Sequence, residues 1–277
     1  MAETKMHFHV GCSGWSYDGW KGTFYPRGMP ISKELAYYAS VFDVVEIDST
    51  FYNIPRHDVV QQWHDKTPAG FMFVAKMFQG ITHKLHEVAS EGGLEQLVER
   101  YFAALAPLEE KLQVVVIQFP PRLSMKYIDD VTALVDYLPS TRRFAIEFRD
   151  STWFDAEPIM TRIRGQQNFS IAGSIHPDVQ PFIKQTADFF VFRFIGDREL
   201  SSFGTILRDK EEEMKQVKAS MDSEFQDIRD TFVFFNNHYA GFGPASANLF
   251  KQMVGLQPVR FGIVKGQASL GDFMQPW

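Results

Sequence analysis

Polar side chains occur at the ends of several short apolar runs, and their spacing places them on shared faces. The clearest pairs are Glu46 with Asp48, Glu147 with Arg149, and Asn236 with His238. Successive side chains of a strand point in opposite directions, so residues two apart lie on one face. Strands that stay apolar up to their last residues suit a parallel sheet covered by helices, and α/β barrels build their sites at the carboxyl ends of such strands. We therefore expect these residues to meet at one mouth of a barrel.

The carboxylates and one lysine of this set are the candidates for acid/base chemistry. Glu46 and Glu147 are the best general acid and base, because desolvation and neighbouring cations can tune a carboxyl pKa. Lys76 has the same parity at the end of another run and can orient an oxygen, stabilise an enolate-like charge or form an imine. We favour the electrostatic role. Asp48 is assigned to substrate binding. The structural alternative is an internal ion network that neutralises the same charges.

Two arginines and a glycine-rich turn suggest binding of an anion. Arg149 and Arg193 have planar guanidinium groups that suit a carboxylate or phosphate of a substrate, or salt bridges to the neighbouring glutamates. Barrels often bind phosphate between the loops after strands seven and eight. Gly196, Arg198 and the helix start near Gly243 therefore form, with Arg193, a candidate phosphate pocket.

The triplet Asn236-Asn237-His238 is unusual for a strand end, because Asn is a poor strand former and a buried amide needs partners. Opposite parity predicts that one Asn points into the mouth with His238 while the other braces a loop. His238 can serve as an acid or base, as a metal ligand or as a cap for the next turn. A divalent metal held by His238, His176 and carboxylates is an open alternative, although no compact ligand motif is present and the sequence requires no cofactor.

Aromatic residues in the loops after the strands suit stacking against a sugar ring or a nucleobase. Those assigned to substrate binding are Trp15, Tyr17 and Tyr52. Trp20 and Phe154 are instead expected to pack within the loops themselves.

Strand-like runs alternate with helical patterns along most of the chain. Strands are predicted at 7–12, 44–48, 71–76, 114–119, 144–149, 169–174, 189–194 and 232–237. Helices are predicted at 32–40, 58–65, 94–105, 128–137, 156–165, 208–229 and 245–254. Alternation implies parallel pairing and right-handed crossovers, so we predict a single (β/α)8 TIM-type barrel. The connection 175–187 contains two prolines and no helical period, which predicts an irregular sixth crossover.

Composition indicates one soluble domain over residues 1–277. Hydrophobic residues make up 45% of the chain, enough for a sizeable core, and no Pro/Gly/Ser-rich linker divides it. The net charge of −6 offers no broad attraction to nucleic acid or anionic membrane. The single cysteine, Cys12, excludes an internal disulfide and fits a reducing compartment. No stretch has the length of a signal peptide's apolar region or of a membrane span, so a cytoplasmic location is expected.

Six groups of residues, in this order along the chain, also form family-like motifs. They are Gly11-Cys12-Ser13-Gly14-Trp15-Ser16-Tyr17, Val45-Glu46-Ile47-Asp48-Ser49-Thr50-Phe51-Tyr52, Phe73-Val74-Ala75-Lys76 with Ile81-Thr82-His83, Gln118-Phe119-Pro120-Pro121, Glu147-Phe148-Arg149 with Trp153-Phe154, and Phe235-Asn236-Asn237-His238. Together they resemble the DUF72 family, also called YecE-like proteins. The resemblance implies a TIM-type barrel related to sugar isomerases, without an established reaction, substrate or cofactor. The family often has Arg-x-His-Gly after the seventh strand, whereas this chain has Arg193-Phe194-Ile195-Gly196, so no histidine role is transferred to Ile195.

Two functions of different classes follow from these features. The preferred one is a small-molecule enzyme that uses acid/base chemistry on a sugar-like or phosphorylated metabolite, as an isomerase ahead of a hydrolase. The alternative is a non-catalytic protein that binds a nucleotide or single-stranded nucleic acid, with aromatics for bases and arginines for phosphates. The acidic net charge favours the enzyme. No membrane partner is expected, and the oligomeric state is open.

Overall fold

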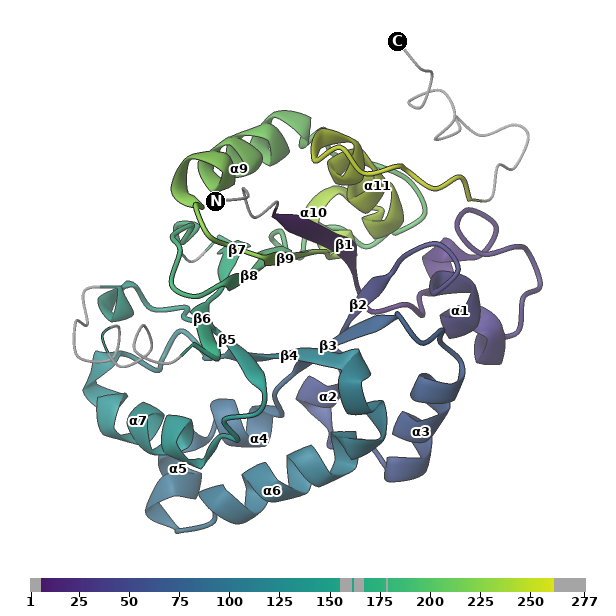
Figure 1. Ribbon diagram of the computed structural model, residues 1–277. Coiled ribbons are helices and arrows are strands. Elements are labelled where there is room, and N and C mark those ends of the chain that lie inside the picture. The colour runs from purple at the N-terminus through teal and green to yellow at the C-terminus, as the bar shows by residue number, and fades with distance from the viewer. Residues whose placement is uncertain (1–5, 155–160, 162–166, 178, 262–277) are drawn as a thin grey trace.

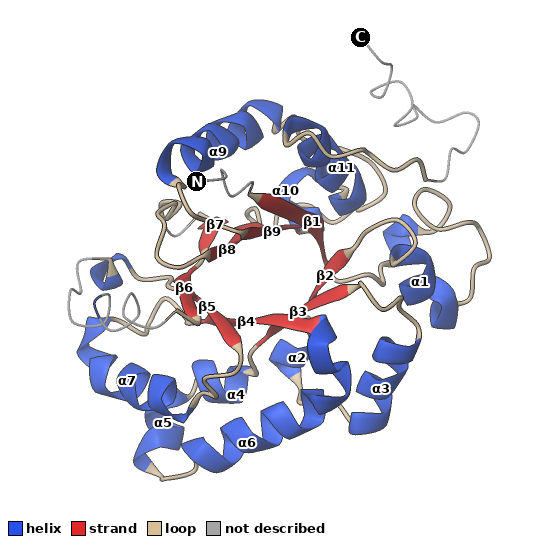
Figure 2. Cartoon of the chain, in the orientation of Figure 1, coloured by secondary structure: helices blue, strands red, loops and turns tan. Residues whose placement is uncertain are grey.

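The computed structural model describes residues 6–154, 161, 167–177 and 179–261. In this part of the chain, nine strands form a ring that is covered on its outside by helices (Figures 1 and 2). The strands are β1 (His7–Ser13), β2 (Val44–Ile47), β3 (Met72–Lys76), β4 (Leu112–Gln118), β5 (Arg143–Glu147), β6 (Phe169–Ile171), β7 (Gly173–Ile175), β8 (Phe189–Phe194) and β9 (Asp230–Phe235). The predicted α/β barrel is confirmed.

The sheet is parallel, with the strand order β6-β5-β4-β3-β2-β1-β9-β8-β7. The prediction of one continuous strand at 169–174 is wrong, because this segment divides at Ala172. Its first part pairs with β5 and its second part pairs with β8, while the Ala172 amide donates to the Ile146 carbonyl oxygen at 2.8 Å. One residue thus joins the two ends of the sheet, and the barrel is nearly closed.

Six helices of the outer layer correspond to predicted ones. They are α1 (Ile31–Tyr38), α3 (His57–Asp65), α6 (Leu94–Leu105), α7 (Ile128–Tyr137), α9 (Glu211–Glu224) and α11 (Gly243–Met253). The predicted helix at 156–165 lies outside the described residues, apart from residue 161. Between β7 and β8 the described residues form no helix, as the irregular sixth crossover predicted.

Several short helices escaped the sequence analysis because a segment of one turn shows no apolar period. They are α2 (Ser49–Tyr52), α4 (Gln79–Thr82), α5 (Leu85–Ser90) and α10 (Asn237–Ala240), with 3₁₀ turns at Asp18–Trp20, Ala106–Lys111, Met125–Tyr127 and Ser151–Trp153. Helix α5 and the 3₁₀ segment Ala106–Lys111 have six residues each, and the others have three or four. Three of them, α2, α4 and α10, directly follow strands and shape the mouth of the barrel.

Each strand separates two apolar layers, because its side chains alternate. In β2, Val44 faces an inner cluster and Val45 and Ile47 belong to an outer cluster shared with the helices. Valines, alanines and phenylalanines fill the inside of the ring, so the opening between the ribbons in Figure 1 is a packed core. The outer faces of the strands pack against the apolar sides of the helices.

A polar cluster lies at the amino ends of three strands. His9 Nε2 is 3.1 Å from Asp230 Oδ1, and Arg143 Nη1 donates to Asp230 Oδ2 at 2.9 Å. His9 Nδ1 lies 3.8 Å from Asp43 Oδ2. Burial alone would lower the His9 pKa, but the hydrogen bonds to Asp230 and Asp43 outweigh it and raise this pKa to about 9. A charged histidine therefore belongs to the folded state at neutral pH.

The stability of the fold is expected to depend on pH through His9. Its raised pKa stabilises the folded protein fully below the usual pKa of 6.5, and this contribution is lost as the pH rises towards 9. Urea unfolding of the parent and of His9→Gln should differ by about 2 kcal/mol near pH 6 and converge above pH 9. A constant difference across this range would contradict the assignment.

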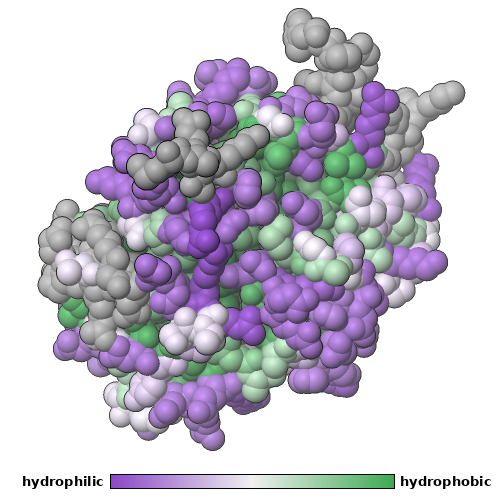
Figure 3. Space-filling view, in the orientation of Figure 1, coloured by the Kyte–Doolittle hydropathy of each residue, from purple (hydrophilic) through white to green (hydrophobic). Residues whose placement is uncertain are grey.

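The face seen in Figure 3 is covered mostly by hydrophilic side chains, with hydrophobic ones between them. It therefore presents no broad apolar surface among the described residues drawn there. None of the described helices combines the length and the apolar character that crossing a lipid bilayer requires.

Candidate active site

The inner face of the barrel changes from apolar to polar at the carboxyl ends of five strands. The residues at this level are Glu46 of β2, Lys76 of β3, Gln118 of β4, Glu147 of β5 and Arg193 of β8. Each is two residues beyond an inner apolar side chain, such as Val44, Val74 or Val191. The alternation predicted from the sequence therefore brings these side chains together in the structure.

Arg193 is the centre of this level. Its Nε is 2.6 Å from Glu46 Oε1, and its Nη1 is 2.6 Å from Glu147 Oε2. Nη1 also donates to Gln118 Oε1 at 3.1 Å. All three charged side chains are at most 2% exposed. We call the six charged residues here the charge network: Glu46, Asp48, Lys76, Glu147, Arg149 and Arg193.

The other members of the charge network lie nearer the solvent. Arg149 Nε donates to Glu147 Oε1 at 2.5 Å. Lys76 Nζ lies 3.5 Å from Asp48 Oδ1 and 4.4 Å from the centre of the Phe51 ring. Three carboxylates thus meet three cations, so the ion pairing that the sequence offered as an alternative is present. Pairing by itself does not decide whether any of these groups is catalytic.

Burial and charge give the two glutamates opposite acidities. Complete burial raises the Glu46 pKa, and Arg193 only partly opposes this because Asp48 lies nearby. Burial also acts to raise the Glu147 pKa, but Arg149 and Arg193 outweigh it and lower this pKa to about 2. A pair of carboxyl groups whose pKa values are driven apart is a feature of acid/base sites.

The pKa of Lys76 is lowered, so its ammonium group loses its proton more easily than that of an exposed lysine. Burial and the charge of Arg193 lower its pKa, and Asp48 opposes them. Only 8% of the residue is exposed. A lysine in this state can give up or accept a proton more readily near neutral pH than an exposed lysine can.

A cavity of about 550 Å³ opens above the charge network. Its lining consists of Asp48, Tyr52, Lys76, His83, Gln118, Pro121, Arg149, His176, Pro177, Arg193, Ile195, Gly196, Asp197, Arg198, Asn236 and His238. Glu46 and Glu147, the predicted general acid and base, are absent from this lining and lie beneath it. Direct contact with a ligand therefore falls to Asp48, Lys76 and the residues of the surrounding loops.

Asn236 and His238 both reach the cavity, as the parity argument predicted, but they do so from a helical turn and not from a strand. β9 ends at Phe235, and Asn236 begins α10 by accepting a hydrogen bond from the His238 amide at 3.0 Å. Asn236 and His238 line the cavity from this turn. Burial lowers the His238 pKa, so its imidazole is neutral at neutral pH.

Asn237 and Gly243 were predicted to bind substrate, but the structure places both in the framework. Asn237 Oδ1 accepts hydrogen bonds from Trp20 Nε1 and from the Gly243 amide, each at 2.9 Å. The Gly243 amide is therefore occupied and cannot hold an anion. Asn237 is the Asn that braces a loop, as the parity argument allowed.

The remaining part of the predicted phosphate pocket is the loop after β8. Gly196 has φ +79°, and a Cβ there would lie 2.4 Å from the His238 carbonyl oxygen. Only glycine allows this close approach of the loop to α10. Gly196, Arg198 and Arg193 all line the cavity, but the charge of Arg193 is already paired with Glu46 and Glu147.

The three aromatics assigned to substrate binding separate in the structure. Tyr52 is 57% exposed and lines the cavity. Trp15 packs edge-on against Trp63, with ring centres 5.6 Å apart, and Tyr17 packs on Trp20 at 4.9 Å. Trp15 and Tyr17 therefore belong to loop packing rather than to the cavity lining.

His83 and Asp197 line the cavity, but the sequence analysis assigned neither of them to the site. His83 is in the motif Ile81-Thr82-His83, seven residues after the end of β3, where α4 turns the chain back over the mouth. A histidine that follows a strand by one helical turn was the available signal.

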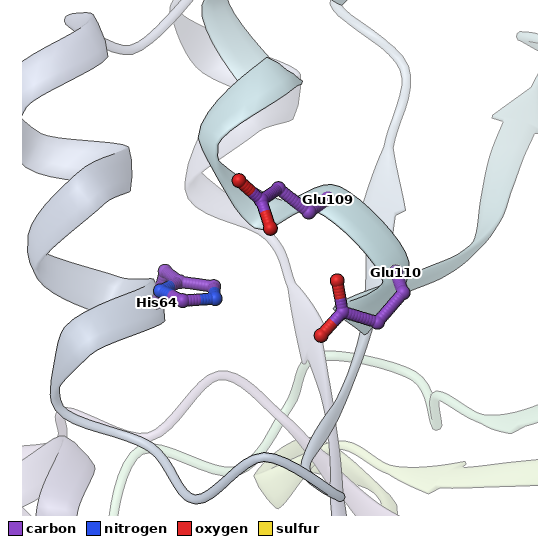
Figure 4. Close-up of side chains that lie close together, drawn as sticks. All are labelled: His64, Glu109 and Glu110. Atoms are coloured by element: carbon purple, nitrogen blue, oxygen red, sulfur yellow. The ribbon is translucent and has the colours of Figure 1, made fainter.

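No cluster of metal ligands forms at the mouth among the described residues. In the described part of the chain, one group of three His and acidic side chains has its ligand atoms within 4.8 Å of one another. It consists of His64, Glu109 and Glu110, which point towards each other in Figure 4. His64 lies in the last turn of α3 and the two glutamates precede β4, so this group lies at the opposite end of the barrel. His176 and His238, the histidines of the metal alternative that the sequence left open, belong to no such group among the described residues.

The comparisons with known proteins agree with this architecture. Residues 9–268 match the family described as "Protein of unknown function DUF72". The chain belongs to the DUF72 family. UPF0759 protein YunF of Bacillus subtilis (strain 168) is 26% identical over 296 residues, which cover 95% of this chain and 99% of YunF. UPF0759 protein YecE of Escherichia coli (strain K12) is 25% identical over 146 residues, or 53% of this chain and 50% of YecE.

Solved structures of DUF72 proteins share the fold. A DUF72 family protein from Thermotoga maritima MSB8 is 28% identical, with a TM-score of 0.73, and the match covers 91% of this chain and all of that one, 100%. One from Enterococcus faecalis V583 is 20% identical, with a TM-score of 0.71, over 92% of this chain and 100% of that one. The names of these relatives specify no reaction, so function is inferred here from the site.

Proposed function

We propose that the cavity is the active site of an enzyme that moves protons on a small sugar-like metabolite carrying an anionic group. The observation that carries this proposal is Lys76. It is buried, its pKa is lowered, it lines the cavity, and it lies 3.5 Å from the Asp48 carboxylate. Perturbed groups that face a cavity are typical of active sites.

Isomerisation suits this pair of side chains. The reaction needs a base for a proton on the carbon beside a carbonyl group, and a cation near the oxygen of the resulting enediolate. Asp48 can act as the base, and Lys76 can stabilise the enediolate. His238 is neutral and can exchange a proton with the substrate oxygens. Hydrolysis is the second choice.

Glu46 and Glu147 act indirectly in this proposal. They hold Arg193 and Arg149 in place from beneath the lining. The described lining residues include four basic side chains and two carboxylates. The basic ones are Lys76, Arg149, Arg193 and Arg198, and the carboxylates are Asp48 and Asp197. This balance favours a ligand with negative charge, such as a phosphorylated sugar.

The test is a thermal-shift screen of neutral and phosphorylated sugars, with and without a chelator, followed by turnover in D₂O. A ligand that binds the folded state raises the melting temperature. A substrate should also gain deuterium at the carbon that loses its proton. Asp48→Asn should slow this exchange by about 10²-fold or more, whereas the exposed control Lys215→Met on α9 should not.

Binding without any exchange or turnover would favour the alternative, a nucleotide-binding protein. The affinity for single-stranded DNA should then be measured at increasing salt concentrations. A steep loss of affinity indicates recognition of the phosphate backbone, and no binding at low salt removes the nucleic-acid alternative.

A further inference from the structure

His83 lies on one side of the cavity, where it follows α4. Its Nδ1 is 3.0 Å from Thr82 Oγ1, and the Phe51 ring meets it edge-on at 5.0 Å. The ring is thus held from two sides. Nε2 has no hydrogen-bond partner among the described residues, and so it is the nitrogen available to a ligand.

The ionisable groups that act on His83 in the described structure are all cations. Arg122 Nη2 donates to the His83 carbonyl oxygen at 2.5 Å. Lys76 lies over the same Phe51 ring that His83 contacts, and Arg149 lines the same cavity. Burial, followed by the charges of Arg122, Lys76 and Arg149, lowers the His83 pKa to about 4. Cations converge here without a carboxylate of comparable influence on the imidazole.

Lys76 and Arg149 have carboxylate partners on their inner sides, in Asp48 and Glu147. The exposed Arg122 forms no ion pair within the described residues. An oxyanion at this point would contact the imidazole Nε2–H and gain from three positive charges. The neutral imidazole with Nε2 protonated is the form that can donate to it.

We propose that Lys76, His83 and Arg149, which line the cavity, form the subsite for the anionic group of the ligand, a phosphate or a carboxylate. Arg122, which lies outside the lining and donates to the His83 backbone, adds positive charge beside this subsite. This inference rests on the proposed function and specifies how the ligand is oriented in the cavity. The anionic end lies at the loops after β3, β4 and β5, rather than at the loops after β8 and β9, the predicted seventh and eighth strands, that the sequence favoured. The Gly243 amide and Arg193, two parts of the latter pocket, already have partners.

An anion bound beside His83 favours its protonated form, so anion binding and the His83 pKa are linked in both directions. The test is a titration of the full chain with inorganic sulfate, whose charge is constant over the range used. NMR follows the His83 imidazole, which is assigned with His83→Gln. The His83 pKa should rise by about one unit or more as sulfate binds.

Two exposed arginines locate the subsite. Arg122→Met should weaken sulfate binding roughly 5-fold to 10-fold, while the matched change Arg100→Met, at an exposed arginine of the outer helix α6, should leave it nearly unchanged. Parallel titrations with phosphate and acetate show which oxyanion is preferred. A larger loss of affinity in Arg198→Met, at the loop after β8, than in Arg122→Met would overturn the inference. So would an unchanged His83 pKa in the sulfate complex, or no oxyanion binding by the parent.

The outcomes for the two proposals are separable. Turnover of a neutral sugar without oxyanion binding would remove the subsite and the anionic group of the substrate, and would keep the proton transfer by Asp48 and Lys76. A sulfate response at His83 with no substrate in the metabolite screen would keep the subsite and remove the proposed reaction.

Discussion

Glu147→Gln is expected to lower the free energy of unfolding by about 3–5 kcal/mol at neutral pH, because it leaves Arg149 and Arg193 buried without their shared carboxylate. The Glu147 pKa is lowered to about 2, so its contribution is present above the usual pKa of 4.5 and is lost as the pH falls towards 2. Urea unfolding should therefore show a gap between parent and variant that narrows over this interval.

Glu46→Gln is the matched control for this change. It is also fully buried against Arg193, but burial raises its pKa, so the folded state favours its neutral acid more than that of Glu147. Gln resembles the neutral acid in shape, and the loss of stability should be clearly smaller. Equal losses in the two variants would show that their different electrostatic surroundings do not govern stability.

Lys76→Met is expected to reduce turnover of a substrate from the screen by about 10²-fold to 10⁴-fold, with little loss of stability. Met keeps most of the apolar stem and removes a charge whose burial is unfavourable. The measurement is the initial rate of exchange in D₂O, together with a melting curve.

Lys251→Met provides an unusually close control. Lys251 is 9% exposed, its pKa is lowered by burial, and it lies 5.6 Å from the centre of the Phe42 ring, on α11 and outside the cavity lining. Turnover should be unaffected there. Similar rate losses in both variants would assign the effect to structure.

The pH profile separates the two roles open to Lys76. If its ammonium stabilises an enediolate, the rate should fall as the pH rises through its lowered pKa. If its free amine forms an imine, the rate should rise with pH through the same region.

The strand interior was the part of this protein that the sequence predicted best. Glu46, Lys76, Glu147 and Arg193 were placed by the two-residue period of a strand, which holds as long as the backbone remains extended. The same rule cannot extend past the last strand residue. Residues 236–238 line the cavity partly through a helical turn, and Asp48 also lies beyond the end of β2.

Loop residues were predicted less well, because their partners are distant in sequence. Nothing near Gly243 indicates that Asn237 occupies its amide, or that Trp20 donates to the same Asn237 oxygen from the other end of the chain. Trp15 packs on Trp63 for similar reasons. The two-residue period predicts that the glutamate side chains point into the barrel, but it does not predict how deeply they are buried. Their burial beneath the cavity lining excludes them from direct contact with a ligand.

The division of the sixth strand gives the buried ion pair a second significance. β5 carries Glu147 and β8 carries Arg193, and these two strands flank the join where β6 passes into β7. Ser174 of β7 donates to Glu147 Oε1 at 3.3 Å, from between them. The Arg193–Glu147 pair is therefore a cross-link over the seam of the barrel. A ligand that binds Arg193 or Arg149 would compete with Glu147 for these arginines, so ligand binding is expected to weaken the link between β5 and β8.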